Sequence, residues 1–304
     1  MNLDNQFQAR LEKIAKARRA LENKLKYYYC YDKLAYACVQ GSTNYNLDVY
    51  NEQYESDVDW KVFIFPTFED LYTGEKTSTT FKYEYGQFEL KDIRLLPELL
   101  GKMNSSYVEL LFSEYTIVFP QYETYINQLR ELGNGLVEDR LPLLVKSLMG
   151  MCKEKSNSLC HEYESLKEKL AYFGGYDPKQ LHHALRILCM LQNINGCVEN
   201  HITISYENIM KIKSREKKNY LIDIKVNGTQ FGLPEALDLM KDCLEKCQKI
   251  YNKFWDPCTK KPIYPYKTNL NNYITPISNF NLNKIEEIVY ELVLNYFQNN
   301  FNKF

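Results

Sequence analysis

The sequence lacks a long apolar run, an apolar signal core in its first residues and an excess of charge of either sign. No stretch approaches the ~18 consecutive apolar residues of a membrane-spanning helix, so we expect no membrane partner. Residues 1–29 contain no apolar signal core, which predicts a cytoplasmic protein. The formal net charge is −1, so a broad surface that tracks nucleic-acid phosphates is not indicated. P-loop and GxGxxG motifs are also missing, which argues against these two phosphate-binding loops.

The composition that remains is typical of a soluble globular protein. Hydrophobic residues make up 45% and charged residues 25% of the 304 residues, which argues against disorder and suffices to bury a core. The nine cysteines are odd in number and widely spread. Cys243 and Cys247 have helical i,i+4 spacing, and Cys258 follows. Because no CxxC pair occurs, we favour buried free thiols over a zinc site there.

Hydrophobic patterning divides the chain into two parts. The first part mixes the two element types, with helices predicted at 5–27 and 91–112, the latter broken near Asn104, and strands at 33–40, 58–65, 80–90 (bent or paired at Gly86) and 115–120. Later residues are mostly helical, at about 121–132, 140–172, 178–193, 233–254 and 281–298. A flexible joint is predicted at Gly133-Asn134-Gly135. We therefore expect an α+β protein with a small mixed-sheet domain, residues 1–125, followed by a mostly helical domain, residues 126–304.

The residues that carry chemistry lie between the first two predicted strands. Gly41-Ser42 ends one strand, and Asp57 and Asp59 open the next. Side chains at i and i+2 of a strand share a face, so the two carboxylates project together, about 6–7 Å apart at Cα. Carboxylates bind hard cations, and two Mg²⁺ ions stabilise the attacking and leaving oxygens of phosphoryl transfer. The Gly-Ser turn adds N–H groups and a hydroxyl for a triphosphate. A solvated acidic pair is the alternative.

Five segments resemble a known family. QGSTNYNL (40–47) and ESDVDWKVF (55–63) resemble the active-site signature of the DNA polymerase β nucleotidyltransferase superfamily. Three further segments resemble a narrower family, the RNA repair pathway DNA polymerase beta family of bacteria and phages. They are LKDIRLLPELLGKMNSSYVELLFSE (90–114), GYDPKQLHHALRIL (175–188) and NYLIDIKVNG (219–228). These segments follow the family's order and span roughly residues 38–255. The sequence departs from the family at Asn44 and Asn46, where Ala and Gly are usual. Because Asn tolerates left-handed backbone angles, we expect the turn to be kept.

The resemblance implies a polymerase-β-like fold and a set of site residues. Asp57 and Asp59 would hold two Mg²⁺ or Mn²⁺ ions, and Gly41 and Ser42 would hold the phosphates of a nucleoside triphosphate. A third carboxylate is expected on a neighbouring strand. Glu89, flanked by apolar residues, is the first choice, and Asp92 and Glu84 are the alternatives.

A helix of the second part is also implicated. The resemblance covers Lys179, His183 and Arg186, which share one helix face at i, i+4 and i+7 and would bind the triphosphate. The opposite face, which includes Leu185 and Leu188, would pack into the helical domain. A solvated polar face is the alternative interpretation.

Together these features predict a metal-dependent nucleotidyltransferase. It would transfer a nucleoside monophosphate from a triphosphate to an acceptor hydroxyl and release pyrophosphate. The family's association with RNA makes RNA or tRNA a candidate acceptor, while DNA, protein and small molecules stay open, as does the oligomeric state. The alternative function is that of a non-catalytic relative that binds a nucleotide or a partner protein.

Overall fold

The computed structural model describes residues 3–51, 54–162, 167–228, 232–263 and 277–300. It confirms an α+β protein with one mixed sheet. The chain forms two compact units: residues 1–44, 48–136 and 279–304 make the first, and residues 45–47 and 137–278 make the second. In the described part of the chain, no helix combines the length and the apolar character that crossing a membrane requires.

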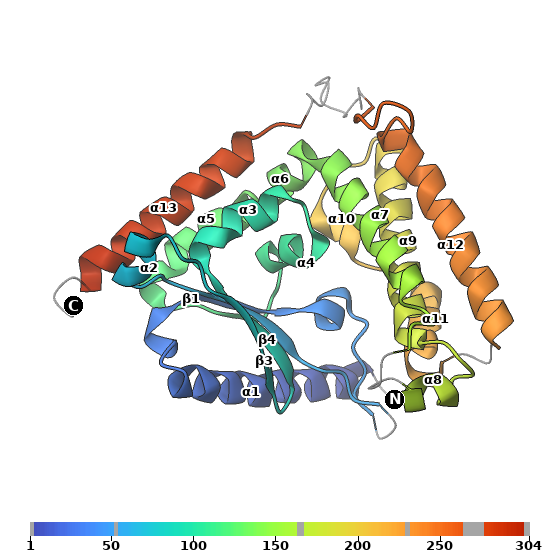
Figure 1. Cartoon of the computed structure of the whole chain (residues 1–304), viewed down its shortest axis with the longest axis horizontal. Helices are drawn as coiled ribbons and strands as arrows, with labels where there is room; N and C mark the ends of the chain where they lie inside the picture. Colours follow the sequence, from blue (N-terminus) through green and yellow to red (C-terminus); the bar gives the residue numbers. More distant parts are fainter. Residues whose placement is uncertain (1–2, 52–53, 163–166, 229–231, 264–276, 301–304) are drawn as a thin grey trace. The chain divides into compact units, whose positions relative to one another are not determined.

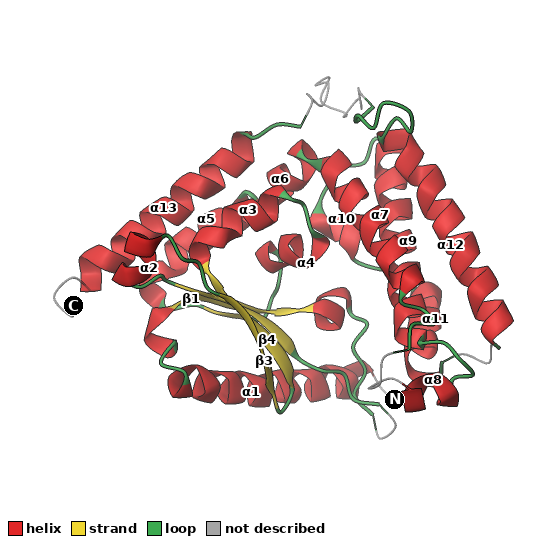
Figure 2. Cartoon of the chain, in the orientation of Figure 1, coloured by secondary structure: helices red, strands yellow, loops and turns green. Residues whose placement is uncertain are grey.

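The sheet, drawn in yellow in Figure 2, lies in the first unit. Its strand order is β3-β4-β2-β1-β5. Its strands are β1 (Leu34–Gln40), β2 (Asp59–Ile64), β3 (Ser78–Tyr83), β4 (Gly86–Asp92) and β5 (Thr116–Ile117). β2 and β4 are parallel, and the other neighbours are antiparallel. The segment predicted at 80–90 is therefore a hairpin, whose strand β4 begins at the expected breaker Gly86.

One face of the sheet packs against helix α1 (Leu3–Tyr27), which confirms the helix predicted at 5–27 (Figure 1). Leu21 and Leu25 are one turn apart on the buried side of α1 and are fully buried with Trp60 and Phe88 of the sheet. Alternate residues of a strand point to opposite faces, so Asp59 and its same-face neighbours turn away from this core.

Short helices and the C-terminal helix complete the first unit. They are α2 (Phe68–Thr73), α3 (Leu96–Gly101), α4 (Ser105–Val108), α5 (Glu123–Glu131) and α13 (Phe280–Asn300), which packs on α3 and α5. Phe65, which follows β2, stacks on Tyr296 of α13 with 4.1 Å between ring centroids. The C-terminal helix thus belongs with the sheet, whereas the sequence pattern predicts it in the helical domain of residues 126–304.

The flexible joint predicted at residues 133–135 is wrong, because these residues form the first turn of helix α6 (Gly133–Asp139). The glycines serve close packing there. A Cβ atom on Gly133 would lie 2.7 Å from the Phe112 ring, and one on Gly135 would lie 2.7 Å from the Asn281 side chain. Because glycine has no side chain, other segments can approach the helix closely at these two positions. The local sequence does not reveal this reason for having glycine there.

The second unit is a set of packed helices. They are α7 (Leu141–Asn157), α8 (Lys167–Tyr172), α9 (Pro178–Glu199), α10 (Tyr206–Met210), α11 (Arg215–Asn227) and α12 (Leu233–Phe254). α7, α9 and α12 contact one another, and α10 and α11 also pack on α9 (Figure 1). The helix predicted at 140–172 is therefore too long, since α7 ends at Asn157 and α8 is separate.

Candidate functional site

The Gly-Ser turn and the first strand acid lie at the same end of the sheet. β1 ends at Gln40, which pairs with Asp59 across the antiparallel β1–β2 ladder. Gly41 follows immediately with φ +82°, a left-handed conformation that glycine adopts without strain, and it begins a short 3₁₀ segment, Gly41–Tyr45. Asn46 also has a positive φ of 57°, a left-handed conformation that asparagine tolerates better than most residues.

Asp57 and Asp59 are held by the β3–β4 hairpin. Asp57 is exposed and Asp59 is half-buried at the start of β2. The Gln87 N–H donates to Asp59 Oδ1 at 3.0 Å, and the intervening Val58 N–H donates to the Tyr85 carbonyl at 2.8 Å. Gly86 lets the hairpin come this close: a Cβ there would lie 2.8 Å from Asp59 Oδ1 and 3.3 Å from Asp57 Cβ.

Glu89 shares the face of Asp59 and is paired with a lysine. Lys61, two residues after Asp59 in β2, is the register partner of Glu89 in the parallel strand β4, so all three side chains point to one face. Lys61 Nζ lies 2.6 Å from Glu89 Oε1. The Lys61 side chain is 3% exposed and that of Glu89 is 22% exposed, so the ion pair is mostly removed from water.

The two partners perturb each other's pKa. Burial lowers the pKa of Lys61, and the hydrogen bond and charge of Glu89 offset this only in part. For Glu89, burial acts to raise the pKa, but the hydrogen bond and charge of Lys61 prevail and hold it below its ordinary value. The ion pair therefore favours the charged form of Glu89, whereas burial disfavours the charged form of Lys61.

Two residues of the segment 90–114 cover this polar face. The Tyr107 hydroxyl donates to Glu89 Oε2 at 3.0 Å, and Lys61 Nζ lies 4.2 Å from the centre of the Tyr107 ring. The buried Glu109 accepts a hydrogen bond of 3.1 Å from the Gly41 N–H. The turn proposed to hold a triphosphate therefore has one backbone donor bound to an acid of its own chain.

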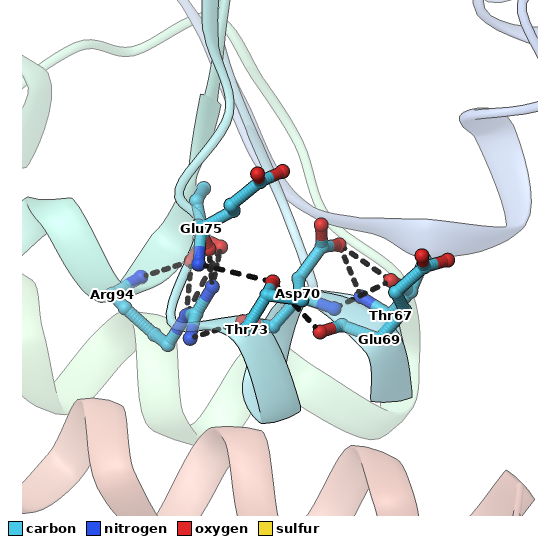
Figure 3. Close-up of polar contacts among 7 residues, drawn as sticks. Thr67, Glu69, Asp70, Thr73, Glu75 and Arg94 are labelled. Atoms are coloured by element: carbon cyan, nitrogen blue, oxygen red, sulfur yellow. Dashed lines mark hydrogen bonds and ion pairs between the residues drawn. The ribbon is translucent and has the colours of Figure 1, made fainter.

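The other two candidates for a third carboxylate are placed differently. Asp92 pairs with Ile64, at the opposite end of β2 from Asp59. It is buried and accepts from the backbone N–H and the guanidinium of Arg94, which also donates to the carbonyls of Asp70 and Glu75 (Figure 3). Glu84 is exposed in the turn between β3 and β4. Of the three, Glu89 has the register position closest to Asp59.

The residues expected to bind phosphate on the helical part lie in the second unit, on α9. Lys179 is exposed, His183 is half-buried and Arg186 is 8% exposed, so the three do not form a solvated face. The Arg186 guanidinium lies 4.1 Å from the centre of the Tyr45 ring, and its buried Nε makes no hydrogen bond within the described residues. Burial is also the main cause that lowers the pKa of His183 well below its ordinary value.

The neighbouring His182 has a structural role that the sequence did not suggest. Its Nδ1 lies 2.7 Å from the Leu221 carbonyl oxygen of α11, and the residue is 2% exposed. Burial lowers its pKa to about 3, so the ring is neutral at physiological pH. Because α9 and α11 pack together, this contact ties the two helices within the second unit.

Sequence reasoning missed Lys61, Tyr107 and Glu109. The alternation of DVDWK carried a signal for the first, because Asp57, Asp59 and Lys61 are spaced i, i+2 and i+4 and share a strand face. No comparable signal placed Tyr107 and Glu109, since their approach to β4 and to Gly41 depends on how a later segment folds back on the sheet.

No protein-family model matches the sequence, and neither does any curated protein. The resemblance to the polymerase-β superfamily therefore depends on the segments quoted above alone.

Proposed function

We propose that the protein is a metal-dependent nucleotidyltransferase with its reactive centre on the polar face of the sheet. The observation that carries the proposal is the pairing of Gln40 with Asp59. It brings the glycine turn and an acid to one end of the sheet, although 18 positions separate Gly41 from Asp59. Exposed Asp57 lies two residues before that acid, and Glu89 lies on the same face of the sheet as Asp59.

The reaction proposed is transfer of a nucleoside monophosphate. The oxygen of an acceptor hydroxyl attacks the α-phosphorus, the bond from that phosphorus to the bridging oxygen breaks, and pyrophosphate leaves. The hydroxyl proton passes to a carboxylate or to water. Gly41 and Ser42 would orient the terminal phosphates, and most of the rate would come from positioning and charge neutralisation.

Two of the three proposed metal ligands are aspartates, whose carboxylate oxygens are the donors that a hard cation prefers. Asp57 is exposed, and Asp59 is half-buried and accepts from the Gln87 N–H. Bound Mg²⁺ or Mn²⁺ would supply charge neutralisation at the phosphates. Glu89 fits less simply, since one oxygen is bound to Lys61 and the other to Tyr107. Ligation by Glu89 requires that a metal replace the lysine as its cation.

This ion pair favours the alternative function, a non-catalytic nucleotide-binding relative. Lys61 already neutralises the acid that would complete a metal site, so the charge of Glu89 does not require a bound cation. The two functions differ in what Glu89→Gln does. Catalysis predicts a large loss of rate with little change in nucleotide affinity, whereas binding alone predicts no turnover in any variant.

The test is incubation of the full chain with labelled nucleoside triphosphates, Mg²⁺ or Mn²⁺, and total RNA. We expect labelled product, and we expect Asp57→Asn or Asp59→Asn to reduce it by at least about 100-fold, because loss of even indirect metal contacts costs 10–100-fold. Asp32→Asn, at an exposed acid of the same unit, is the matched control and should be silent.

The same variants separate a functional pair from a structural one. Removing one of two neighbouring negative charges relieves repulsion, so the melting temperature of the metal-free Asp57→Asn and Asp59→Asn proteins should hold or rise. A large fall in melting temperature would mean that the acids hold the fold together. Tight nucleotide binding without product in the unaltered protein would instead support the alternative function.

A further inference from the structure

Three cysteine side chains meet in the interior of the second unit. Cys152 comes from α7, while Cys243 and Cys247 come from successive turns of α12. All three residues are fully buried, and their Sγ atoms lie within 4.8 Å of one another. The i,i+4 spacing of Cys243 and Cys247 was visible in the sequence. Tertiary packing completes the group with Cys152 and leaves Cys258 exposed.

The spacing of these sulfur atoms suits zinc. Zn–S bonds of about 2.3 Å in a tetrahedral site place two sulfur ligands roughly 3.8 Å apart. Cys152 Sγ and Cys247 Sγ are 3.7 Å apart. The third sulfur, of Cys243, lies 3.4 Å from the carbonyl oxygen of Ala184 on α9, which is a candidate for the fourth ligand atom.

The cluster differs from the protein's other buried thiols. Cys197 is also buried but lies outside the cluster, packed as a small apolar side chain. Cys152, Cys243 and Cys247 come from two helices, and their sulfur atoms lie within 4.8 Å of one another. A thiolate is the form of cysteine that ligates a metal, and three sulfur atoms at this separation can share one ion.

We propose that Cys152, Cys243 and Cys247 bind one zinc ion, with the Ala184 carbonyl oxygen at the fourth position. Each thiol releases its proton to solvent on binding, so three thiolates and Zn²⁺ leave the site with a charge of −1. All four positions are provided by protein atoms, which is the closed arrangement of a structural site. The ion joins α7, α9 and α12, the three helices that pack together in this unit.

The direct test is the metal content of the purified full chain. After growth with added zinc and removal of loose metal, elemental analysis should find about one zinc per chain. The variants Cys152→Ala and Cys247→Ala should retain little zinc. Their zinc affinity, measured by competition with a chelator, should fall by more than about 100-fold, because losing a residue that only contacts a metal ligand already costs about 10–100-fold. Cys197→Ala, which removes a buried thiol outside the cluster, is the matched control and should bind zinc normally.

A measurement on the unaltered chain covers the case in which the variants fail to fold. Alkylation mapped by mass spectrometry in mild denaturant should label Cys152, Cys243 and Cys247 only after a chelator is added, while exposed Cys160 and Cys258 react in both conditions. The proposal is overturned by an unaltered chain that holds no zinc, by labelling that does not respond to the chelator, or by a Cys152–Cys247 disulfide in the protein as isolated.

Discussion

The buried ion pair between Lys61 and Glu89 makes a quantitative prediction about stability. Breaking a buried pair by removing one partner costs about 3–5 kcal/mol, because the remaining charge is left without compensation. Lys61 has 3% of its side chain exposed, so Glu89→Gln should cost about 3 kcal/mol. Lys61→Met should cost less, about 2 kcal/mol, because Glu89 retains 22% exposure, the Tyr107 hydroxyl and a second cation, Lys91 Nζ, at 3.8 Å.

The double variant distinguishes an interaction from two separate losses. With both charges removed, no buried charge is left uncompensated, so Lys61→Met with Glu89→Gln should cost less than either single variant, about 1 kcal/mol in total. The resulting coupling energy of about 4 kcal/mol is measured from urea unfolding of the four proteins. Additivity of the two single effects within about 0.5 kcal/mol would refute the reasoning.

A second pair provides the matched control for this cycle. Lys102 Nζ and Glu98 Oε1 are also 2.6 Å apart, but their side chains are 65% and 58% exposed. Distance alone would predict equal coupling for both pairs. Because water screens the exposed pair, a double-mutant cycle on Lys102 and Glu98 should give a coupling energy near zero.

Three further outcomes are expected. Burial lowers the pKa of His182 to about 3, so between about pH 3 and 6.5 this residue binds fewer protons in the folded state than in the unfolded state. Its contribution to the free energy of unfolding is therefore complete above about pH 6.5 and is lost as the pH falls toward 3. Measured by urea unfolding, the free energy of unfolding should be about 2 kcal/mol lower at pH 5 because of His182. The variant His182→Gln should lack this decrease and keep the one that is due to His183. Gly133→Ala should destabilise by about 1–3 kcal/mol through contact with Phe112, whereas Gly150→Ala, on α7 with nothing within 4 Å, should stabilise by about 0.5–1 kcal/mol; thermal unfolding that showed equal effects would contradict the packing role of Gly133. Arg186→Ala should weaken triphosphate binding in calorimetry by about 1.5–3 kcal/mol, and unchanged affinity in both Arg186→Ala and Lys179→Ala would remove α9 from the proposed function.

Local patterns in the sequence predicted most of the elements. The helix at 233–254 matches α12, and the strand at 58–65 contains β2, because apolar period and flanking breakers are properties of short segments. The same patterns placed Gly41 and Asp59 at strand ends. Their adjacency in the sheet follows from an antiparallel connection, the simplest pairing of two successive strands.

Tertiary structure decided the contacts between distant segments. Glycines 133 and 135 read locally as a joint, but packing against Phe112 and Asn281 makes them part of a helix. Lys61 became the partner of Glu89 only because β2 and β4 are parallel and in register. Cys152 joins Cys243 across 91 positions of sequence because two helices pack face to face. Such contacts depend on burial and register summed over the whole unit, which no short window of residues contains.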